Sequence, residues 1–194
     1  MKRALFLSAA LLTLAAACGR YNATTDSELA TQGAATVDAD RLSNAGADLD
    51  NWLTYGRTYE EQRYSPLDQI NDKTIGELEL AWAVELDTSR GQEATPLIVD
   101  GVMYISTAWS KVMALDAATG DVQWKFDPEN IGAKAAHACC DVVNRGVAVW
   151  NGKVYVGTID GRLIALDAAT GHKVWEKITV DQAQPYTITM APRA

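Results

Sequence analysis

The sequence has 194 residues and an acidic balance, with 25 Asp and Glu against 17 Lys and Arg and a formal net charge of −8 at pH 7. Such a charge disfavours binding to nucleic acid or to an anionic membrane surface, because both partners are themselves negative. It is compatible with attraction for a basic protein partner, and also with a net charge that only keeps the protein soluble.

The N-terminal residues predict a secretory leader. MKR is followed by an apolar run from Ala4 to Ala17, and Cys18 comes directly after it. A basic start, an apolar middle and small residues before the cut are typical of a signal peptide over residues 1–17, and the run is shorter than the ~20 residues that span a bilayer. Cys18 also allows cleavage as a lipoprotein, although Leu14 stands one place further from it than in a typical lipobox. We therefore expect export to the periplasm, with or without a lipid on Cys18.

Residues 18–50 are rich in Ala, Thr, Asp and Gly and show little apolar periodicity. This composition predicts a mobile N-terminal arm with one short helix near residues 37–44. In residues 51–71 aromatic and charged side chains are interleaved, which favours a loop-rich cap over one end of the domain formed by residues 51–194.

An internal repeat decides the architecture of residues 51–194. The stretch GVMYISTAWSKVMALDAATGDVQWKF begins at Gly101 and GKVYVGTIDGRLIALDAATGHKVWEK begins at Gly152, an offset of 51 positions. Each unit reads as short alternating strands joined by turns, with Asp-x-x-Thr-Gly supplying the turn before the last strand. Four strands in about 40 to 50 residues are typical of a β-propeller blade. The sequence therefore predicts an all-β propeller.

A tryptophan recurs at the same place in both units, Trp124 and Trp175, and predicts a wedge between neighbouring blades. LELAWAVELD, residues 78–87, resembles the Trp-bearing last strand of a unit whose earlier strands are missing. In a closed ring such a strand completes the final blade, which the far end of the chain supplies. About two and a half blades are present, whereas closed propellers have about 4 to 8, so we expect an N-terminal fragment of a longer protein or a truncated product.

The first strand of each blade lines the propeller axis, so equivalent positions of successive blades converge on one site. The repeat places Glu93 of EATP against Asn144 of NRGV, and a small deletion places Thr189 of TMAP at the same position. We expect these side chains and that of Arg145 to face the axis. A guanidinium, a carboxylate and a hydroxyl together suit a flat, polyanionic cofactor. The alternative is that Arg145 only joins loops and pairs with Glu93.

Cys139 and Cys140 are adjacent in HACCDVV, and Cys18 is the one other cysteine of the sequence. Apart from Cys18, these two can pair with each other, stay reduced or bridge to another chain, and the cysteine count favours the first. A bond between neighbours closes a very small ring and forces the peptide toward a cis or strongly twisted geometry, which costs roughly 3 kcal/mol. The flat ring that results would offer an apolar face to a planar ligand.

His137 precedes the cysteines and invites a metal site, yet metal thiolate sites space their cysteines by two or more residues. We interpret His137 as a loop histidine without a ligand role. No CxxCH motif for covalent haem and no Gly-rich nucleotide fingerprint occur in these residues. Neither haem attachment nor NAD binding is therefore supported within this stretch.

Several of these motifs together resemble one family. WLTYGRTYEEQRYSPLDQIN, QEATPL, ACCDVVNRGVA, the two ALDAATG repeats and YTITMAP are similar, in order and spacing, to the pyrroloquinoline quinone (PQQ) dependent alcohol dehydrogenases. The resemblance covers residues 51–193 and is greatest to the quinohaemoprotein alcohol dehydrogenases and the ethanol and methanol dehydrogenases. It implies an eight-bladed propeller that holds PQQ on its axis with a calcium or lanthanide ion.

The resemblance also implies roles for five residues. Cys139 and Cys140 match the disulfide ring over one face of the quinone, and Arg145 matches the arginine that hydrogen-bonds the quinone oxygens. Glu93 matches an acidic residue that contacts the cofactor, and Thr189 a cofactor-binding threonine. The implied reaction oxidises a primary alcohol to an aldehyde, with hydride passing to the quinone and electrons then to a c-type cytochrome or a haem c domain of the same protein.

Other parts of the implied site lie past Ala194. They are the metal-binding glutamate and asparagine, the catalytic aspartate and the lysine near the quinone, so the chain as given is expected to be inactive. Two alternatives remain open. A non-enzymatic propeller lipoprotein that helps to assemble outer-membrane proteins would explain the repeat and Cys18 but not the adjacent cysteines, Arg145 or Glu93. A PQQ sugar dehydrogenase would generally lack the adjacent cysteines and carry N-terminal membrane spans.

Overall fold

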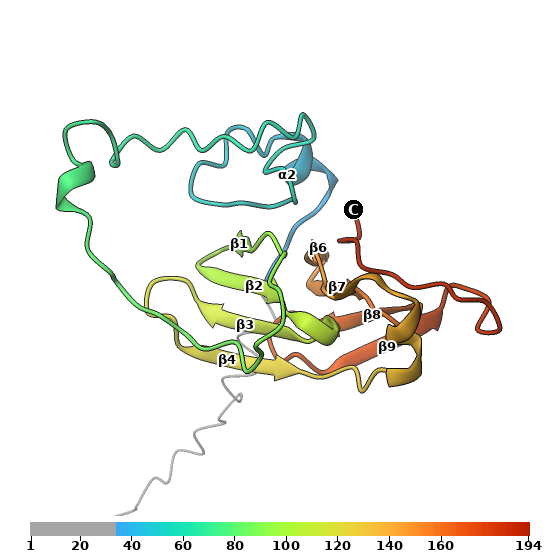
Figure 1. Ribbon diagram of the computed structural model, residues 1–194. Coiled ribbons are helices and arrows are strands. Elements are labelled where there is room, and N and C mark those ends of the chain that lie inside the picture. Colours follow the sequence, from blue (N-terminus) through green and yellow to red (C-terminus); the bar gives the residue numbers. More distant parts are fainter. Residues whose placement is uncertain (1–33) are drawn as a thin grey trace, which may run out of the picture.

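The computed structural model describes residues 34–194, so the predicted signal peptide and Cys18 lie outside the described residues. Two four-stranded antiparallel sheets, each with its strands in chain order, form the body of the molecule (Figure 1). The first sheet, blade 1, consists of β1 (Leu97–Val99), β2 (Val102–Ser106), β3 (Val112–Asp116) and β4 (Val122–Phe126). The second, blade 2, consists of β6 (Ala148–Trp150), β7 (Lys153–Gly157), β8 (Arg162–Asp167) and β9 (Lys173–Ile178).

The remaining elements of the described chain are short. They are the helix α2 (Ala39–Ser43), the 3-10 helices η1 (Ile75–Glu77), η2 (Ala108–Ser110) and η3 (Gly132–His137), and the strand β5 (Cys139–Val142). Within residues 34–194 no helix has the length and apolar character needed to cross a bilayer. The two blades coincide with the two sequence repeats, and each strand predicted within these two repeats is present.

The Asp-x-x-Thr-Gly motif forms the turn between the third and fourth strands of each blade, as predicted. The Asp116 carboxylate accepts hydrogen bonds from the backbone N–H groups of Ala118 and Thr119, both at 2.9 Å, and Asp167 accepts the equivalent bonds in blade 2. Gly120, which ends the motif in blade 1, has a φ of +79°, a left-handed conformation that glycine adopts without steric cost. The motif therefore sets where each outer strand begins.

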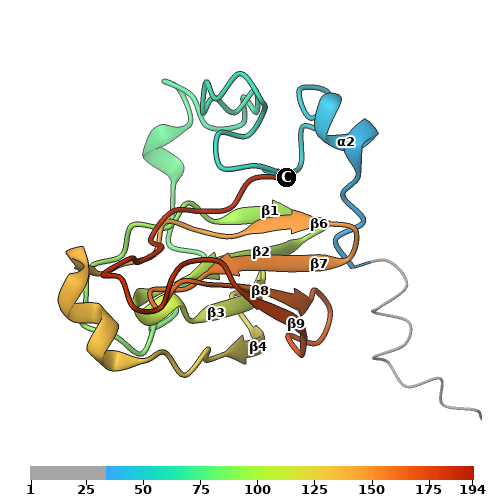
Figure 2. The ribbon, with the colours of Figure 1, turned by 90° about the vertical axis from the view of Figure 1, so that its right-hand side faces the viewer.

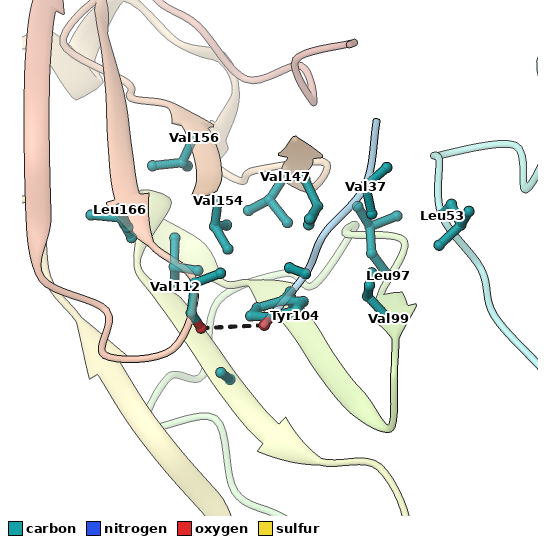
Figure 3. Close-up of a cluster of buried hydrophobic side chains, with 14 of the residues drawn as sticks. Val37, Leu53, Leu97, Val99, Tyr104, Val112, Val147, Val154, Val156 and Leu166 are labelled. Atoms are coloured by element: carbon teal, nitrogen blue, oxygen red, sulfur yellow. Dashed lines mark hydrogen bonds between the residues drawn. The ribbon is translucent and has the colours of Figure 1, made fainter. Parts of the chain in front are cut away.

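The main hydrophobic core lies between the two blades and draws side chains from both (Figure 3). Figure 2 shows β1 and β6 at the same level of neighbouring blades, and fully buried Val99 and Val154 come from opposite sides of this interface. The Tyr104 hydroxyl crosses it and donates to the carbonyl of Ala168 at 3.2 Å. Since a buried hydroxyl without a partner would be destabilising, this bond also fixes the alignment of the blades.

Trp124 fills the outer part of the same interface, as the repeat predicts. Its side chain is 8% exposed, and its indole N–H donates to the carbonyl of Ala168 at 3.0 Å. A Cβ atom built on Gly171 would come within 2.6 Å of the indole ring. The glycine of the blade 2 turn is therefore required by the tryptophan of the preceding blade as well as by its own backbone conformation.

Residues 78–87 form no strand in the structure, so the prediction of a last strand here is wrong. A strand needs a hydrogen-bonded neighbour, and no strand of the described chain pairs with this segment. Trp82 nevertheless takes the wedge position against blade 1: its indole N–H donates to Ala117 at 3.3 Å, and a Cβ on Gly120 would come within 2.6 Å of its ring. The tryptophan is therefore placed as the repeat predicts, without its sheet.

The described part of the predicted arm, residues 34–50, packs against both blades, which differs from the mobility expected of it. Ala35, Val37 and Leu42 are buried in the main core. α2 lies within the predicted helical region, and its N-cap Asp38 accepts a hydrogen bond from the backbone N–H of Arg41 at 2.8 Å. So few apolar residues give no periodic pattern in the sequence. Their burial depends on contacts with residues of the two blades, which are distant in the sequence.

The arm contacts the equivalent β1–β2 and β6–β7 turns of the two blades. In blade 1 the Arg41 guanidinium makes a bidentate pair with the Asp100 carboxylate, at 2.9 and 2.6 Å. In blade 2 the backbone N–H of Asn151 donates to the carbonyl of Val37 at 2.8 Å. The arm therefore connects two turns that are one repeat apart in the sequence.

The stretch of residues 51–71 is a loop, as predicted, and Figure 1 shows it beyond β1. Two backbone hydrogen bonds between Trp52 and Ile98, at 2.9 and 3.1 Å, attach it to blade 1. Leu53 is buried in the main core, whereas Tyr64 and Ile70 are well exposed. The loop therefore covers the blades at its beginning and leaves them further along.

Candidate functional site

Three chain segments that the repeat aligns meet at one point. The backbone N–H of Thr95 donates to the carbonyl of Arg145 at 3.4 Å, and the N–H of Arg145 donates to the carbonyl of Thr189 at 2.9 Å. Gly146 has a φ of +133°, and a Cβ there would lie 3.3 Å from the Thr95 carbonyl oxygen. Glycine thus allows the close approach of backbones that brings the segments together.

The side chain of Arg145 contacts two of the four other predicted cofactor-contact residues, Glu93 and Thr189. Its Nη2 lies 3.0 Å from Glu93 Oε2, and its Nη1 donates to Thr189 Oγ1 at 2.6 Å. The guanidinium is 31% exposed and the carboxylate 42%, so the cluster is open on one side. Because arginine has five N–H donors in a planar fork, these two contacts hold it in place and leave donors that can reach a ligand.

Asn144 does not face the axis, and this prediction is wrong. Its side chain is 1% exposed, its Nδ2 donates to the carbonyl of Gly157 at 2.8 Å, and its Oδ1 accepts from the N–H of Gly146 at 3.1 Å. Both ends of the amide are satisfied inside blade 2, so Asn144 stabilises the turn that presents Arg145. The repeat aligns backbone positions but does not determine which of two adjacent side chains points outward.

Cys139 and Cys140 form a disulfide at the beginning of β5, and both residues are exposed. Their Cα atoms are 3.8 Å apart, the spacing of a trans peptide, and residues 34–194 contain no cis peptide bond. Of the two geometries expected for an adjacent pair, the cis one is therefore not adopted. Asp141, directly after the ring, has a φ of +62°, and its carboxylate pairs with Arg90 at 2.8 Å. This pair connects the ring to the segment that carries Glu93.

His137 is the last residue of η3 and is exposed. In the described part of the chain no three or more His, Cys, Asp or Glu side chains are grouped so that they could hold a metal ion. The exposed disulfide and the Arg145 cluster are therefore the features from which this candidate site is built.

A second arginine, Arg63, for which the sequence predicted no role, packs on Tyr55. Arg63 Cζ lies 4.3 Å from the centre of the Tyr55 ring. This guanidinium has the largest effect in lowering the pKa of the Tyr55 phenol, and Arg145 adds to it. Arg63 and Tyr55 lie among the interleaved aromatic and charged residues 51–71, and this composition and the WLTYGRTYEEQRYSPLDQIN motif were the signals for them. Two cations near one another favour an anionic ligand.

The family described as PQQ, the glucose/ethanol/alcohol dehydrogenase beta-propeller domain, matches residues 52–177. The chain belongs to this family. Membership of the PQQ dehydrogenase family confirms that the two sheets are blades of an all-β propeller.

Relatives in the PQQ dehydrogenase family cover most of this chain. The dehydrogenase subunit of the alcohol dehydrogenase (quinone) of Komagataeibacter europaeus is 59% identical over 149 residues, which are 74% of this chain and 20% of the relative. The solved quinohemoprotein alcohol dehydrogenase ADHIIG of Pseudomonas putida HK5 is 55% identical with a TM-score of 0.81, over 83% of this chain and 24% of that one.

A europium-containing methanol dehydrogenase is 40% identical with a TM-score of 0.74, over 79% of this chain and 27% of that one. The chain thus spans 20% to 27% of the length of these three relatives. Within that span the fold of the described blades is shared with both solved structures.

Proposed function

We propose that the whole protein is a PQQ-dependent dehydrogenase that oxidises primary alcohols to aldehydes, and that this chain supplies one part of its PQQ site. The observation that carries the proposal is the contact of Arg145 with both Glu93 and Thr189, three side chains from three aligned segments. The matching relatives named as quinone and quinohemoprotein alcohol dehydrogenases support the reaction type.

The residues present suit PQQ, which is planar and carries carboxylates and quinone oxygens. Arg145 offers a planar fork of donors for such oxygens, and Thr189 and Glu93 hold that fork in one orientation. The exposed ring of Cys139 and Cys140 offers a compact apolar face for a planar molecule. Arg145 and Thr189 thus supply polar groups for the oxygens of PQQ, and the disulfide ring supplies an apolar surface.

When bound, PQQ supplies the electron acceptor of the reaction. In the mechanism that we propose, Arg145 orients the quinone oxygens, Thr189 fixes one guanidinium N–H, and the disulfide ring limits movement and water access on one face. The catalytic aspartate, the lysine near the quinone and the ligands of a calcium or lanthanide ion come from outside residues 34–194. We therefore also propose that the chain alone does not turn over alcohol.

The electron acceptor that we propose is a c-type cytochrome or a haem c domain of the same protein, in line with the quinohemoprotein relative, and the acidic net charge would favour a basic partner. Export to the periplasm, a signal peptide over residues 1–17 and a lipid on Cys18 remain proposals from the sequence. The propeller would have eight blades. A non-enzymatic scaffold would give no reason for the Arg145 cluster.

The function is tested by reconstituting the whole protein with PQQ and calcium and following ethanol-dependent dye reduction, with PQQ affinity measured by quenching of tryptophan fluorescence. Arg145→Met should weaken PQQ binding about 10- to 100-fold, because charge-assisted hydrogen bonds are lost. Arg41→Met is the matched control, since Arg41 also pairs with a carboxylate but on the arm, and it should leave PQQ affinity unchanged. Absence of PQQ binding by the unmodified protein would refute the proposal.

A further inference from the structure

The disulfide lies at the end of a long connection between the blades, residues 127–141, here named the disulfide loop. Two turns face this loop: TAWSK (residues 107–111) between β2 and β3, and TIDGR (residues 158–162) between β7 and β8, which are equivalent in the repeat. The two turns also contact each other, because the N–H of Ile159 donates to Ser110 Oγ at 3.2 Å. The loop therefore rests on a surface that both blades form.

Little apolar burial holds the disulfide loop in place. η3, which forms its middle, has no buried residue, and the ring is exposed. A small cluster of Ala108, Val142 and Ile159, with partly buried neighbours, is the apolar contact beneath it. A segment with so few buried apolar contacts depends on polar contacts for its position.

Blade 1 supplies two of these polar contacts through the TAWSK turn. Lys111 Nζ lies 2.7 Å from the Asp127 carboxylate, and Asn130 Nδ2 donates to the backbone carbonyl of Trp109. Lys111 and Asp127 are both about half exposed, so water and salt weaken this pair. The contribution of this ion pair is therefore modest.

Blade 2 holds the same stretch of the loop through a buried charge. Asp160 is 1% exposed, and its Oδ2 accepts a hydrogen bond from the backbone N–H of Ile131 at 3.1 Å. Arg162 pairs with Asp160 at 2.9 Å and donates through Nη2 to the carbonyl of Pro128 at 2.7 Å. In blade 1 the position equivalent to Asp160 is Trp109, so this buried carboxylate is specific to blade 2.

The TIDGR turn also contacts the segment that leads to Thr189. Gln182 Nε2 donates to the Asp160 carbonyl at 2.9 Å, and Thr179 Oγ1 donates to the Gly161 carbonyl at 2.9 Å. Lys134 of the disulfide loop donates to the Gln182 carbonyl at 2.6 Å and so connects the two segments directly. One turn thus contacts both the disulfide loop and the segment that leads to Thr189.

We propose that Asp160 is a positioning residue of the PQQ site, which holds the disulfide loop through Ile131 N–H and thereby places the Cys139–Cys140 ring relative to Arg145. The expected effect on PQQ affinity rests on the proposed function. The fixation of the loop by Asp160 does not depend on it. Asp160 does not touch the ring itself. It acts through the loop backbone and through Arg162.

The test uses Asp160→Asn in the whole protein, with two readouts. Hydrogen exchange measured by mass spectrometry without PQQ reports loop fixation, and exchange in residues 127–141 should be about tenfold faster or more, because a hydrogen bond to a buried charge is lost. PQQ affinity from fluorescence quenching should fall about tenfold by the same loss of orientation. The matched control Asp100→Asn breaks the Arg41 pair on the arm and should change neither readout.

A second variant removes the other partner of the same bond. Ile131 has a φ of −68°, which proline adopts, so Ile131→Pro deletes the donor while Asp160 and Arg162 stay in place. It should produce the same two effects, and the double variant should be no worse than the stronger single one. A purely structural role for Asp160 predicts a lower melting temperature with unchanged PQQ affinity and additive effects of the two variants, and this result would overturn the inference. Failure of the unmodified protein to bind PQQ refutes the proposed function, whereas the exchange readout still decides whether Asp160 fixes the loop.

Discussion

The two blades share the same ALDAATG segment, yet their aromatic residues lie in different environments. Trp124 of blade 1 is 8% exposed and bonded to Ala168 of blade 2, whereas Trp175 at the equivalent position is 40% exposed. Tyr104 is fully buried with its hydroxyl bonded across the interface, while Tyr155 is partly exposed. A blade therefore does not complete its own outer face. The following blade supplies the carbonyl and the glycine that its tryptophan needs.

The largest expected effect on this difference comes from replacing each tryptophan with alanine. Trp124→Ala should lower the free energy of unfolding by about 3–5 kcal/mol, because it leaves a cavity between the blades and removes one of the two hydrogen bonds to the Ala168 carbonyl. Trp175→Ala should cost less, about 1 kcal/mol, since its side chain is already 40% exposed. Urea unfolding followed by circular dichroism measures both. In a longer protein with a blade packed on β9, the cost of Trp175→Ala should rise toward that of Trp124→Ala, and equal costs in this chain would contradict the comparison.

The glycines of the blades separate the effect of the neighbouring blade from that of the backbone. Gly171 has a φ of +70° and Gly101 a φ of +81°. A Cβ on Gly171 would collide with Trp124, whereas a Cβ on Gly101 would meet nothing within 4 Å. Gly171→Ala should therefore cost about 2–4 kcal/mol and Gly101→Ala about 1–2 kcal/mol, as backbone strain alone. Thermal and urea unfolding measure the pair. If Trp124→Ala is made first, the excess cost of Gly171→Ala should vanish.

The smallest expected effect concerns the turn at which the blades differ, with Asp160 in blade 2 at the position of Trp109. Burial raises the pKa of the Asp160 carboxyl, but hydrogen bonds from Arg162, Thr158 and the Ile131 N–H outweigh this and hold the pKa below its usual value. Its contribution to stability is then fully present above the unfolded pKa of about 3.9 and is lost as the pH falls through the lower folded pKa.

Asp160→Asn should thus lower the free energy of unfolding by about 1–3 kcal/mol at neutral pH, and by progressively less as the solution is acidified below about pH 4. Urea titrations at pH 7 and at pH 3 measure the difference. An equal loss at both pH values would show that the carboxylate stabilises the blade by packing and not by its charge.

The features that the sequence could predict are those set by local chemistry at a fixed period. The strands follow from alternating apolar residues, the turns from Asp-x-x-Thr-Gly, and the wedge of Trp124 from its recurrence. The region where Glu93, Arg145 and Thr189 meet follows in part from the same period, because the repeat aligns Glu93 with Asn144, the neighbour of Arg145, and a small deletion aligns Thr189. One repeat offset therefore accounts for most of the fold and for the neighbourhood of the candidate site, but not for which side chain points into it.

The features that could not be predicted depend on distant partners. Burial of the arm around Val37 requires a groove that both blades form, and residues 78–87 could form a strand only beside another one. The direction of Asn144 depends on the carbonyl of Gly157, thirteen positions away, which accepts its amide. For Asp160 the sequence does contain a signal: TIDGR replaces TAWSK at a position where the rest of the repeat is similar.

The N-terminal arm has a consequence for the order of the blades. Repeats with the same turn motif and the same tryptophan could in principle pair in the wrong order, because each interface offers similar contacts. The arm distinguishes them: Arg41 requires the carboxylate of Asp100, and blade 2 has Asn151 at the equivalent position, contacted through its backbone. A segment outside the repeat thus makes an ion pair with blade 1 and not with the equivalent position of blade 2. In this way the arm favours one order of the blades around the axis.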